Sequence, residues 1–276
     1  MKYAYFPGCK IAHHLPAHGK SVEAVCAHLG LELHKPEFSC CGYPVRQESR
    51  DASVYSALRS LALCARLGLE LMTPCKCCFG NFRHALHQVG HDEKLKLRMK
   101  DLLADEGLDF PETTRVRHFL QVLDDNRSLV EDAVRRPQKG LKVACHYGCH
   151  ALRPENITHF DDPFAPTIFE RLVALTGASA LPWDLSLECC GYPLRGRDET
   201  ISGLLAARKM AGAKASGADV LATACTYCQL QFGGENHHPD QSIPAVLFSQ
   251  ILGLALGLEP KRLGIEPGEA WVRLAV

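Results

Sequence analysis

The sequence predicts an α/β protein made of two similar halves, and three observations support this class. Residues 40–46 recur at residues 189–195 with a single change from Val to Leu. Short apolar segments alternate with segments of helical periodicity in both halves. Each group of cysteines follows one of the short apolar segments, and open α/β sheets place ligands at the carboxyl ends of their strands. We therefore expect two pseudo-symmetric repeats whose cysteine-bearing loops face a shared site.

The first half alternates short apolar segments with helices. Ser21 is a suitable N-cap, Gly68 is a helix terminator, and the Pro and Gly residues around Cys40–Pro44 and Pro74 predict loops. The expected elements are a strand at Lys2–Phe6, a helix at Ser21–Gly30, a short apolar segment at Leu31–His34, a helix at Asp51–Leu67 and a short apolar segment at Leu69–Thr73.

The second half repeats this order. Its expected elements are a strand at Lys142–Ala144, a helix at Phe164–Leu175 closed by Gly177, a helix at Ser202–Ala215 and a strand at Ala218–Thr223. The charged segment 85–136 is expected to be a helical insertion and connector, and Pro137–Gly140 to be the boundary between repeats 1–140 and 141–276. His237 and His238 are expected in an exposed loop.

Composition argues against several classes of protein. The 276 residues carry 31 Lys and Arg against 31 Asp and Glu, so the chain lacks the positive surplus typical of nucleic-acid binders. The most apolar stretch, Ile243–Leu258, is too short and too interrupted to cross a membrane, and no signal peptide is recognisable at Met1. We therefore expect a cytoplasmic protein without membrane insertion. In that reducing compartment, its 14 cysteines predict metal or redox chemistry rather than structural disulfides.

Each half contains five cysteines in the order C, CC, CxxC. The two sets keep their order, and equivalent positions lie 140 to 150 residues apart. The sets are Cys9, Cys40, Cys41, Cys75 and Cys78 in the first half, and Cys149, Cys189, Cys190, Cys225 and Cys228 in the second. The other four cysteines, which have no counterpart, are Cys26, Cys64, Cys77 and Cys145.

Five thiolates exceed the needs of one zinc ion, which takes four ligands in a tetrahedron. Adjacent cysteines have Cα atoms about 3.8 Å apart and point to opposite sides of an extended backbone, so they reach two metals of one cluster more easily than one ion. Soft thiolate ligands also suit iron–sulfur clusters. This reasoning favours a multi-iron cluster in each half. Zinc in one or both sites, and disulfides alone, stay open as alternatives.

The doubled C, CCG, CxxC array resembles the CCG (cysteine-rich) domain family, and a two-copy chain of this length resembles the B-subunit family of heterodisulfide reductases. The resemblance implies a noncubane [4Fe–4S] cluster in each half, held by the five cysteines of that half. It implies that a small disulfide or thiol substrate sits between the clusters and that each cluster transfers one electron. It also implies a small iron–sulfur C-type subunit and a flavin-containing A-type subunit as partners.

Several residues near these cysteines have two interpretations. His13, His14, His146 and His150 could line a pocket and protonate a departing thiolate, or be ordinary solvated or hydrogen-bonded histidines. Arg46 and Arg195 could bind an anionic substrate group or stabilise the cysteine loop. Cys77 corresponds to Tyr227 and is expected not to be a ligand, Cys145 is expected to be buried or to support the ligands, and Cys26 and Cys64 are expected in the core.

The predicted function is that of a heterodisulfide-reductase-like B subunit, an iron–sulfur disulfide/thiol oxidoreductase in a multi-subunit electron-transfer complex. The chain contains no GxGxxG, P-loop or CxxCxxC motif, so electrons must arrive from another chain. Three alternatives remain. They are an electron-relay subunit of a lactate, glycolate, succinate or membrane-linked respiratory complex, a sulfur-oxidation variant, and a zinc-stabilised scaffold.

Overall fold

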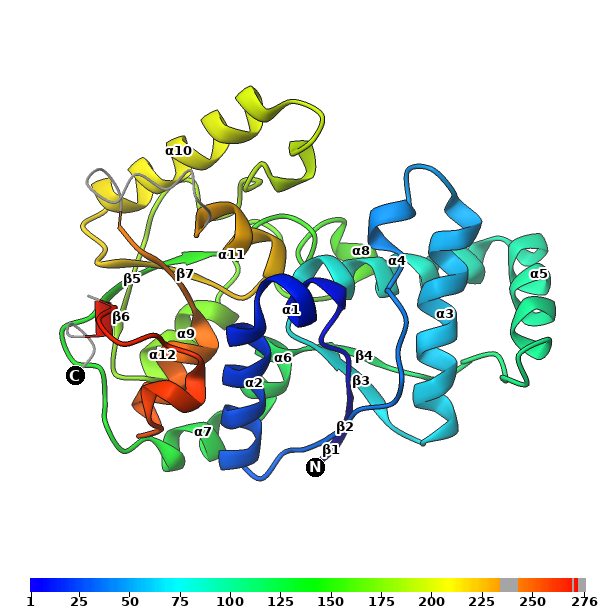
Figure 1. The fold of residues 1–276 in the computed structure, drawn as a ribbon, viewed down its shortest axis with the longest axis horizontal. Helices are drawn as coiled ribbons and strands as arrows, with labels where there is room; N and C mark the ends of the chain where they lie inside the picture. The colour runs from blue at the N-terminus through cyan, green and yellow to red at the C-terminus, as the bar shows by residue number, and fades with distance from the viewer. Residues whose placement is uncertain (234–242, 270, 273–276) are drawn as a thin grey trace.

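The computed structural model describes residues 1–233, 243–269 and 271–272 and contains two four-stranded parallel sheets (Figure 1). Their strand orders, β2-β1-β3-β4 and β6-β5-β7-β8, are the same in both halves, which confirms the predicted α/β class and duplication. The strands are β1 (Lys2–Tyr5), β2 (Glu32–His34), β3 (Glu70–Thr73), β4 (Val116–His118), β5 (Lys142–His146), β6 (Ser179–Leu181), β7 (Val220–Thr223) and β8 (Ala245–Leu247). His237 and His238 lie outside the described residues.

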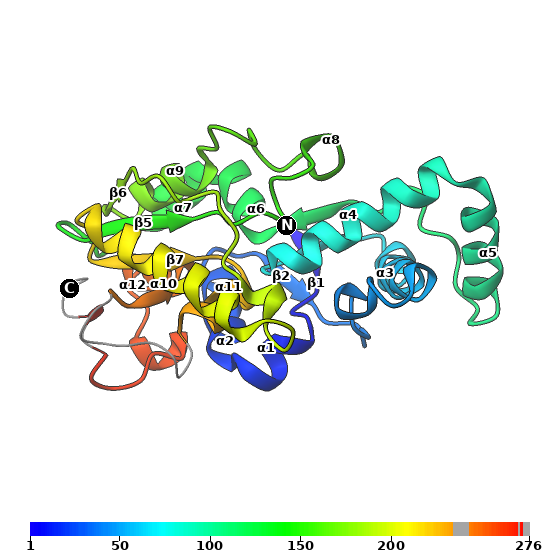
Figure 2. The ribbon, with the colours of Figure 1, turned by 90° about the horizontal axis from the view of Figure 1, so that it is seen from above.

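Helices connect and cover these strands (Figures 1 and 2). They are α1 (Cys9–His14), α2 (Pro16–His28), α3 (Arg50–Arg66), α4 (Lys76–His91), α5 (Glu93–Ala104), α6 (Phe119–Asp125), α7 (Arg127–Ala133), α8 (Glu155–Thr158), α9 (Ile168–Leu175), α10 (Glu199–Ala215), α11 (Thr226–Phe232) and α12 (Phe248–Ala255). In the described part of the chain, no helix is long and apolar enough to cross a membrane.

Several helices begin at a different residue from the one that the sequence indicates. Helix α2 begins at Pro16 rather than Ser21, because proline fits the first helical turn, where its missing N–H has no intrahelical acceptor. Helix α3 begins after Ser49, whose side chain accepts a hydrogen bond from Ala52 N at 3.2 Å. Helix α9 begins at Ile168 rather than Phe164.

The cysteine loops are partly helical. Helix α4 begins at Lys76, directly after Cys75, so Cys77 and Cys78 lie in its first turn and not in an extended CxxC loop. The two CCG segments are tight turns, as expected. Gly42 has φ 87°, and a Cβ there would lie 2.5 Å from Ser53 O, so only glycine fits the turn.

The segment 85–136 contains a strand as well as helices. Strand β4 pairs with β3 and completes the first sheet, as β8 completes the second by pairing with β7. Three residues of strand within a charged segment give little periodicity, so β4 is absent from the sequence-based expectation. The boundary near Gly140 stays a prediction.

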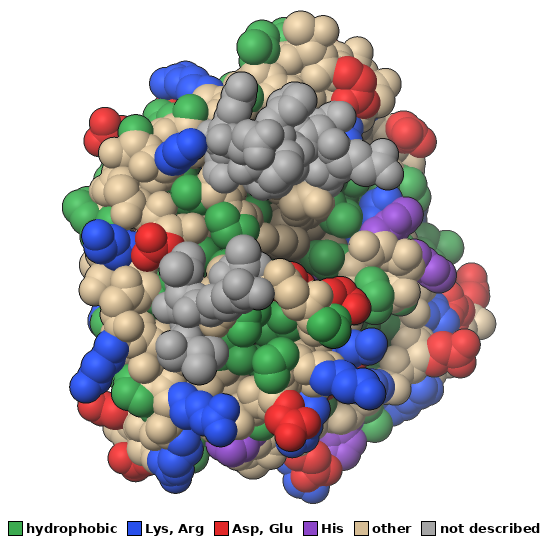
Figure 3. All heavy atoms as spheres, turned by 60° about the vertical axis from the view of Figure 1, so that its left-hand side comes forward, with side chains coloured by type: hydrophobic (Ala, Val, Ile, Leu, Met, Phe, Trp, Pro, Cys, Tyr) green, Lys and Arg blue, Asp and Glu red, His purple; other side chains and the backbone are tan. Residues whose placement is uncertain are grey.

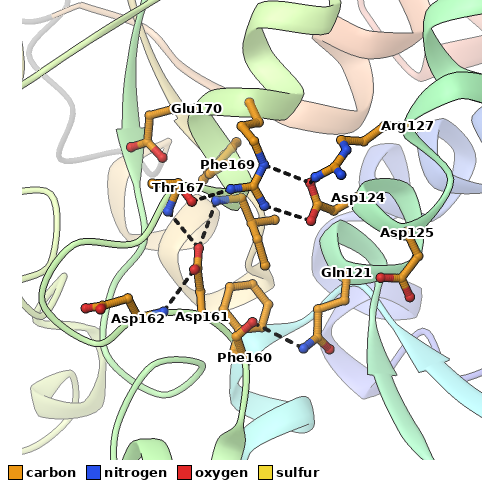
Figure 4. A network of polar contacts seen from close by, with 12 residues as sticks. Gln121, Asp124, Asp125, Arg127, Phe160, Asp161, Asp162, Thr167, Phe169 and Glu170 are labelled. Atoms are coloured by element: carbon orange, nitrogen blue, oxygen red, sulfur yellow. Dashed lines mark hydrogen bonds and ion pairs between the residues drawn. The ribbon is translucent and has the colours of Figure 1, made fainter.

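The two halves interlock through two reciprocal pairs of helices. Helix α12 of the second half packs on α2 of the first, where Ser21 Oγ lies 2.6 Å from Ser249 Oγ. Reciprocally, α6 of the first half packs on α9 of the second, where the guanidinium of Arg171 binds the Asp124 carboxylate at 2.8 Å. Figure 4 shows Asp124 with its dashed contacts at this junction. The buried residues therefore form one continuous hydrophobic core rather than two.

The surface carries mixed charge. Figure 3 shows Lys and Arg side chains interspersed with Asp and Glu side chains over one face, in agreement with the net charge of zero.

Candidate functional site

The first cysteine group lies at the carboxyl ends of β1 and β3. Cys9 opens α1 directly after β1, and Cys75 follows β3. Cys9 Sγ lies 3.9 Å from Cys40 Sγ, and Cys41 Sγ lies 3.3 Å from Cys78 Sγ. Cys9 is exposed, while Cys41, Cys75 and Cys78 are buried. The five predicted thiols of the first half therefore gather at one end of the first sheet.

The second cysteine group occupies the equivalent place at the carboxyl ends of β5 and β7. A small cavity of about 20 Å³ is lined by all five of its cysteines, Cys149, Cys189, Cys190, Cys225 and Cys228. The same cavity is lined by Cys77, which comes from the first half. All fourteen cysteines lie in the described part of the chain, and none of them forms a disulfide.

The two groups meet at the boundary between the halves, where the thiol of Cys225 hydrogen-bonds to that of Cys75. Cys77, outside both groups, lies at the same place: its Sγ is 3.9 Å from Cys225 Sγ and 3.8 Å from His150 Nδ1, which is also 3.5 Å from Cys149 Sγ. Tyr43 Oη lies 3.0 Å from the other ring nitrogen of His150. The expected shared site is therefore present in the geometry.

Close backbone packing holds this boundary together. Gly80 on α4 faces the second half so closely that a Cβ there would lie 2.5 Å from His150 O. The ring centroids of Tyr43 and Tyr227 are 5.4 Å apart, and those of Tyr192 and Tyr227 are 4.7 Å apart. These tyrosines fill the space between the two CCG turns.

Neighbouring thiols change one another's ionisation. Hydrogen bonding with Cys40 and with Cys78 lowers the pKa of Cys41 to about 5. In the second group, the bond from Cys149 and then that from Cys190 lower the pKa of Cys189. A thiolate stabilised by adjacent thiols is the form that binds metals. Each group therefore contains a thiol whose pKa is lowered by its neighbours.

A pocket of about 280 Å³ opens beside the boundary. Its lining includes Arg46, Arg50, His84 and His150 and contains no carboxylate side chain. Arg46 donates to Tyr43 O at 2.7 Å, and its guanidinium carbon lies 3.6 Å above the centre of the Tyr43 ring. Arg195, its counterpart, lies 5.6 Å above the Tyr192 ring and 4.0 Å from Glu199. Arg46 thus faces the pocket while it also stabilises the turn.

The predicted histidines separate into two kinds. His146 and His150 lie among the cysteines, and His146 Nε2 is 3.3 Å from Cys228 Sγ. His13 and His14 are exposed on α1. Cys26, Cys64 and Cys145 are buried, as expected.

Sequence reasoning misses the role of two buried lysines. In the sequence, Lys76 is at most a weak candidate for binding substrate, and Lys209 lies within a predicted helix. In the structure, Lys76 Nζ donates to the backbone oxygens of His146 and Tyr147, and Lys209 Nζ donates to those of Leu185 and Glu188. A comparison of equivalent positions in the two repeats could have found both, because their counterparts are Thr226 and Ser60.

The donor set fits a soft metal centre. Two sets of five converging thiols supply more sulfur ligands than a single tetrahedral ion takes. In the described residues, a ring nitrogen of His146 also lies within 4.8 Å of Cys190 Sγ and Cys228 Sγ. The second group therefore combines imidazole and thiol donors.

Fold and site together define a duplicated α/β protein with two thiol-rich groups at a common boundary. A family model described as "Cysteine-rich domain" (CCG) matches residues 3–83 and 143–233, so the chain belongs to the CCG cysteine-rich domain family. Both copies predicted from the repeat are present.

Relatives extend the match over nearly the whole chain. The chain is 31% identical over 272 residues to the 8-methylmenaquinol:fumarate reductase membrane anchor subunit of Wolinella succinogenes, with 96% of this chain and 95% of the relative covered. It is also 31% identical over 278 residues to the B subunit of the ferredoxin/F(420)H(2)-dependent CoB-CoM heterodisulfide reductase of Methanosarcina acetivorans, with 96% and 92% covered. The predicted resemblance to the heterodisulfide reductase B subunit is confirmed, and these relatives are subunits of redox enzymes.

More distant matches agree. Lactate utilization protein A of Bacillus cereus is 25% identical over 255 residues, covering 91% of this chain and 98% of the relative. A crystal structure of a hypothetical protein from Helicobacter pylori superposes with a TM-score of 0.74 at 15% identity and covers 95% of this chain. The present chain spans 50% of that longer chain, and the likeness establishes the fold.

Proposed function

We propose that this chain is a heterodisulfide-reductase-like B subunit, an iron–sulfur oxidoreductase that cleaves or forms a small disulfide within a multi-subunit complex. The observation that carries the proposal is the meeting of the two five-cysteine groups at one boundary, where the thiol of Cys225 hydrogen-bonds to that of Cys75. Cys77, which belongs to neither group, lies beside this contact, with its Sγ 3.9 Å from Cys225 Sγ. A disulfide takes up two electrons, and a pair of one-electron centres matches that need.

Two [4Fe–4S] clusters are the proposed cofactors, noncubane as the family resemblance implies. The proposed ligands are Cys9, Cys40, Cys41, Cys75 and Cys78 for the first cluster, and Cys149, Cys189, Cys190, Cys225 and Cys228 for the second. When bound, the clusters supply one electron each. Zinc in one of the two sites is the minor alternative.

The chain's own residues bind the substrate and move protons. The pocket beside the boundary presents Arg46 with no carboxylate in the lining, which suits an anionic group on the substrate. Arg50, also in the lining, is already paired with the Asp92 carboxylate at 3.1 Å. His150 Nδ1 lies 3.5 Å from Cys149 Sγ and is placed to protonate a departing thiolate. Tyr43, bonded to the other nitrogen of that ring, orients it.

Partners and location follow from the same proposal. We propose a small iron–sulfur C-type subunit and a flavin-containing A-type subunit as electron donors, because the sequence contains no nucleotide-binding motif. Fourteen free cysteines favour a reducing compartment, so we place the protein in the cytoplasm. The two repeats are proposed to span residues 1–140 and 141–276.

Electron relay without disulfide chemistry is the second candidate function. Its support is the 31% identity to a fumarate reductase anchor subunit, a level equal to that of the heterodisulfide reductase relative. The sulfur-oxidation alternative is a variant that runs thiol or persulfide chemistry in reverse.

An anaerobic EPR experiment tests the proposal. The iron-loaded protein is oxidised with and without a small anionic thiol, and disulfide reduction by a reduced viologen dye is measured in parallel. Disulfide chemistry predicts a thiol-dependent paramagnetic signal and turnover, both lost in Cys189→Ser and kept in Cys64→Ser, whose hydroxyl can still donate to Ser60 O. Iron-loaded protein with neither signal nor turnover would favour relay and overturn the proposal.

A further inference from the structure

The two repeats place equivalent rings beside their cysteine groups, and one pair differs in chemistry. The rings of Phe6 and Phe82 have centroids 4.9 Å apart and cross at 90°, and those of His146 and Phe232 have centroids 5.0 Å apart and cross at 89°. His146 therefore replaces Phe6 at the same place. Its Nε2 lies 3.3 Å from Cys228 Sγ, so the second group has a potential hydrogen-bond donor where the first has an aromatic carbon.

Lys76 belongs to the first half in sequence and to the second group in space. Its Nζ donates to His146 O at 3.1 Å and to Tyr147 O at 3.0 Å, and its side chain is buried. The ammonium lies 5.2 Å from the centre of the Tyr147 ring and 5.0 Å from that of Phe169. The equivalent position in the second half is Thr226, which carries no charge.

Lys209 adds a second buried ammonium on the same side. It replaces Ser60 of the first repeat, and its Nζ donates to Glu188 O at 3.0 Å and to Leu185 O. These oxygens belong to the segment that leads into Cys189 and Cys190. Two lysines thus approach the second group, whereas the equivalent positions of the opposite repeat hold Ser60 and Thr226.

The first group has a weaker cationic environment. Lys10 follows Cys9 in α1 and is partly exposed to solvent, which screens its charge, and the ammonium of Lys76, next to Cys75 in the chain, is bonded to backbone oxygens of the second half. The amide of Asn81, which donates to Cys41 O at 2.7 Å, is neutral. The two cysteine groups are therefore equivalent in sequence, but the second has more buried positive charge nearby than the first.

We propose that the two metal centres differ in reduction potential and that Lys76, Lys209 and His146 give the second centre, held by Cys149, Cys189, Cys190, Cys225 and Cys228, the higher one. This inference rests on the proposed function. Reduction adds one electron, taken from the redox partner, without breaking a bond. The added negative charge is stabilised by nearby buried cations and by hydrogen bonds to the ligand sulfurs, because the low dielectric of the interior strengthens both. The first electron to enter the chain therefore resides on the second centre.

A redox titration followed by EPR tests the proposal on the anaerobic, iron-loaded protein with dithionite as reductant. The wild type should show two one-electron steps at separate potentials. At a fixed potential, Lys209→Met should lower the ratio of reduced to oxidised protein at the second centre at least tenfold. For a one-electron step, a tenfold change corresponds to a decrease of about 59 mV in the reduction potential of that centre. The substitution should leave the lower-potential step in place. Lys209→Arg, which keeps the charge, should retain most of the separation.

Matched variants keep the result interpretable. Ser60→Ala, at the equivalent position of the first repeat, should not move the higher-potential step. Lys76→Met is the second charge-removing variant if Lys209→Met does not accumulate. Two results would overturn this inference and leave the proposed function intact. One is a wild-type protein whose two centres are reduced at the same potential, and the other is a Lys209→Met protein whose two potentials are unchanged. Absence of iron centres would instead contradict the proposed function itself.

Discussion

Cys77 Sγ, on the first turn of α4, lies 3.9 Å from Cys225 Sγ, at the start of α11 in the other repeat. Cys77 belongs to neither cysteine group, and its neighbour Cys75, which belongs to the first, also hydrogen-bonds to Cys225 of the second. The two groups, whose members are about 150 residues apart in the chain, therefore meet here. The contact exists because both CxxC segments end in helices that point toward the same boundary, with the backbone of Gly80 packed against His150. Residues of both repeats therefore form the site together.

Cys77 provides the first prediction. Because its counterpart is Tyr227, we expect Cys77→Ser to keep the iron and sulfide content of the wild type. Cys189→Ser is the positive control and should lose the iron of one centre. Metal analysis of anaerobically purified protein measures both. Loss of half the iron from the Cys77 variant would make Cys77 a ligand.

The packing at Gly80 provides the second prediction. Gly80→Ala should lower the free energy of unfolding by about 1–3 kcal/mol, because its Cβ would lie 2.5 Å from His150 O and would force the halves apart. Gly90→Ala on the same helix meets open space and should be neutral or stabilising by roughly 0.5–1 kcal/mol. Anaerobic thermal denaturation compares the two variants. Equal stabilities would contradict the close contact.

The hydroxyl of Tyr43 provides the third prediction. Tyr43→Phe removes the bond to His150 Nε2 and should reduce disulfide turnover several-fold, since a hydrogen bond of this kind contributes about 1 kcal/mol. Tyr192→Phe in the other repeat is the matched variant and should have a smaller effect. Viologen-coupled kinetics at saturating disulfide measures both, and the iron content should stay constant. Unchanged disulfide turnover in Tyr43→Phe would show that Tyr43 does not position His150 for catalysis.

Buried histidine gives the fourth prediction, a pH dependence of stability. Burial lowers the pKa of His118 to about 3, from about 6.5 in an unfolded chain. Between these values the unfolded state binds the extra proton, so stability falls as the pH falls, by up to about 1.4 kcal/mol per pH unit for this group.

His118→Asn isolates that contribution. His118 Nδ1 accepts a hydrogen bond from Leu120 N at 3.1 Å at the start of α6, and asparagine can cap the helix without titrating. The variant should lose stability less steeply than the wild type between about pH 6.5 and about pH 5. Urea unfolding at each pH measures the slope, and acid lability of the metal centres affects both proteins alike. Identical slopes would show that His118 does not titrate on unfolding.

The sequence was informative wherever the duplication repeated a residue. Cys40–Arg46 and its copy placed the CCG turns, and the strands before Cys9 and Cys149 followed from short apolar segments. The interlocking of α2 with α12 could not be predicted in this way. A repeat shows which residues are equivalent, but the same sequence is compatible with each last helix packing on its own half.

Residues that differ between the two repeats were not recognised from the sequence as part of the site. Lys76 and Lys209 have the helical propensity of surface lysines, and only the structure shows that both are buried beside the second group. Strand β4 was missed because three residues, Val116–His118, are too few for an alternating pattern to stand out. These features depend on tertiary contacts, which local sequence does not encode.

Metal content distinguishes a protein with two iron–sulfur centres from a structural scaffold. The protein is purified without oxygen, and iron, zinc and acid-labile sulfide are measured per chain in the wild type and in Cys189→Ser. Two four-iron centres predict roughly eight irons with matching sulfide in the wild type and about four in the variant. Zinc without iron, from a preparation kept anaerobic throughout, would contradict the account and leave a structural scaffold.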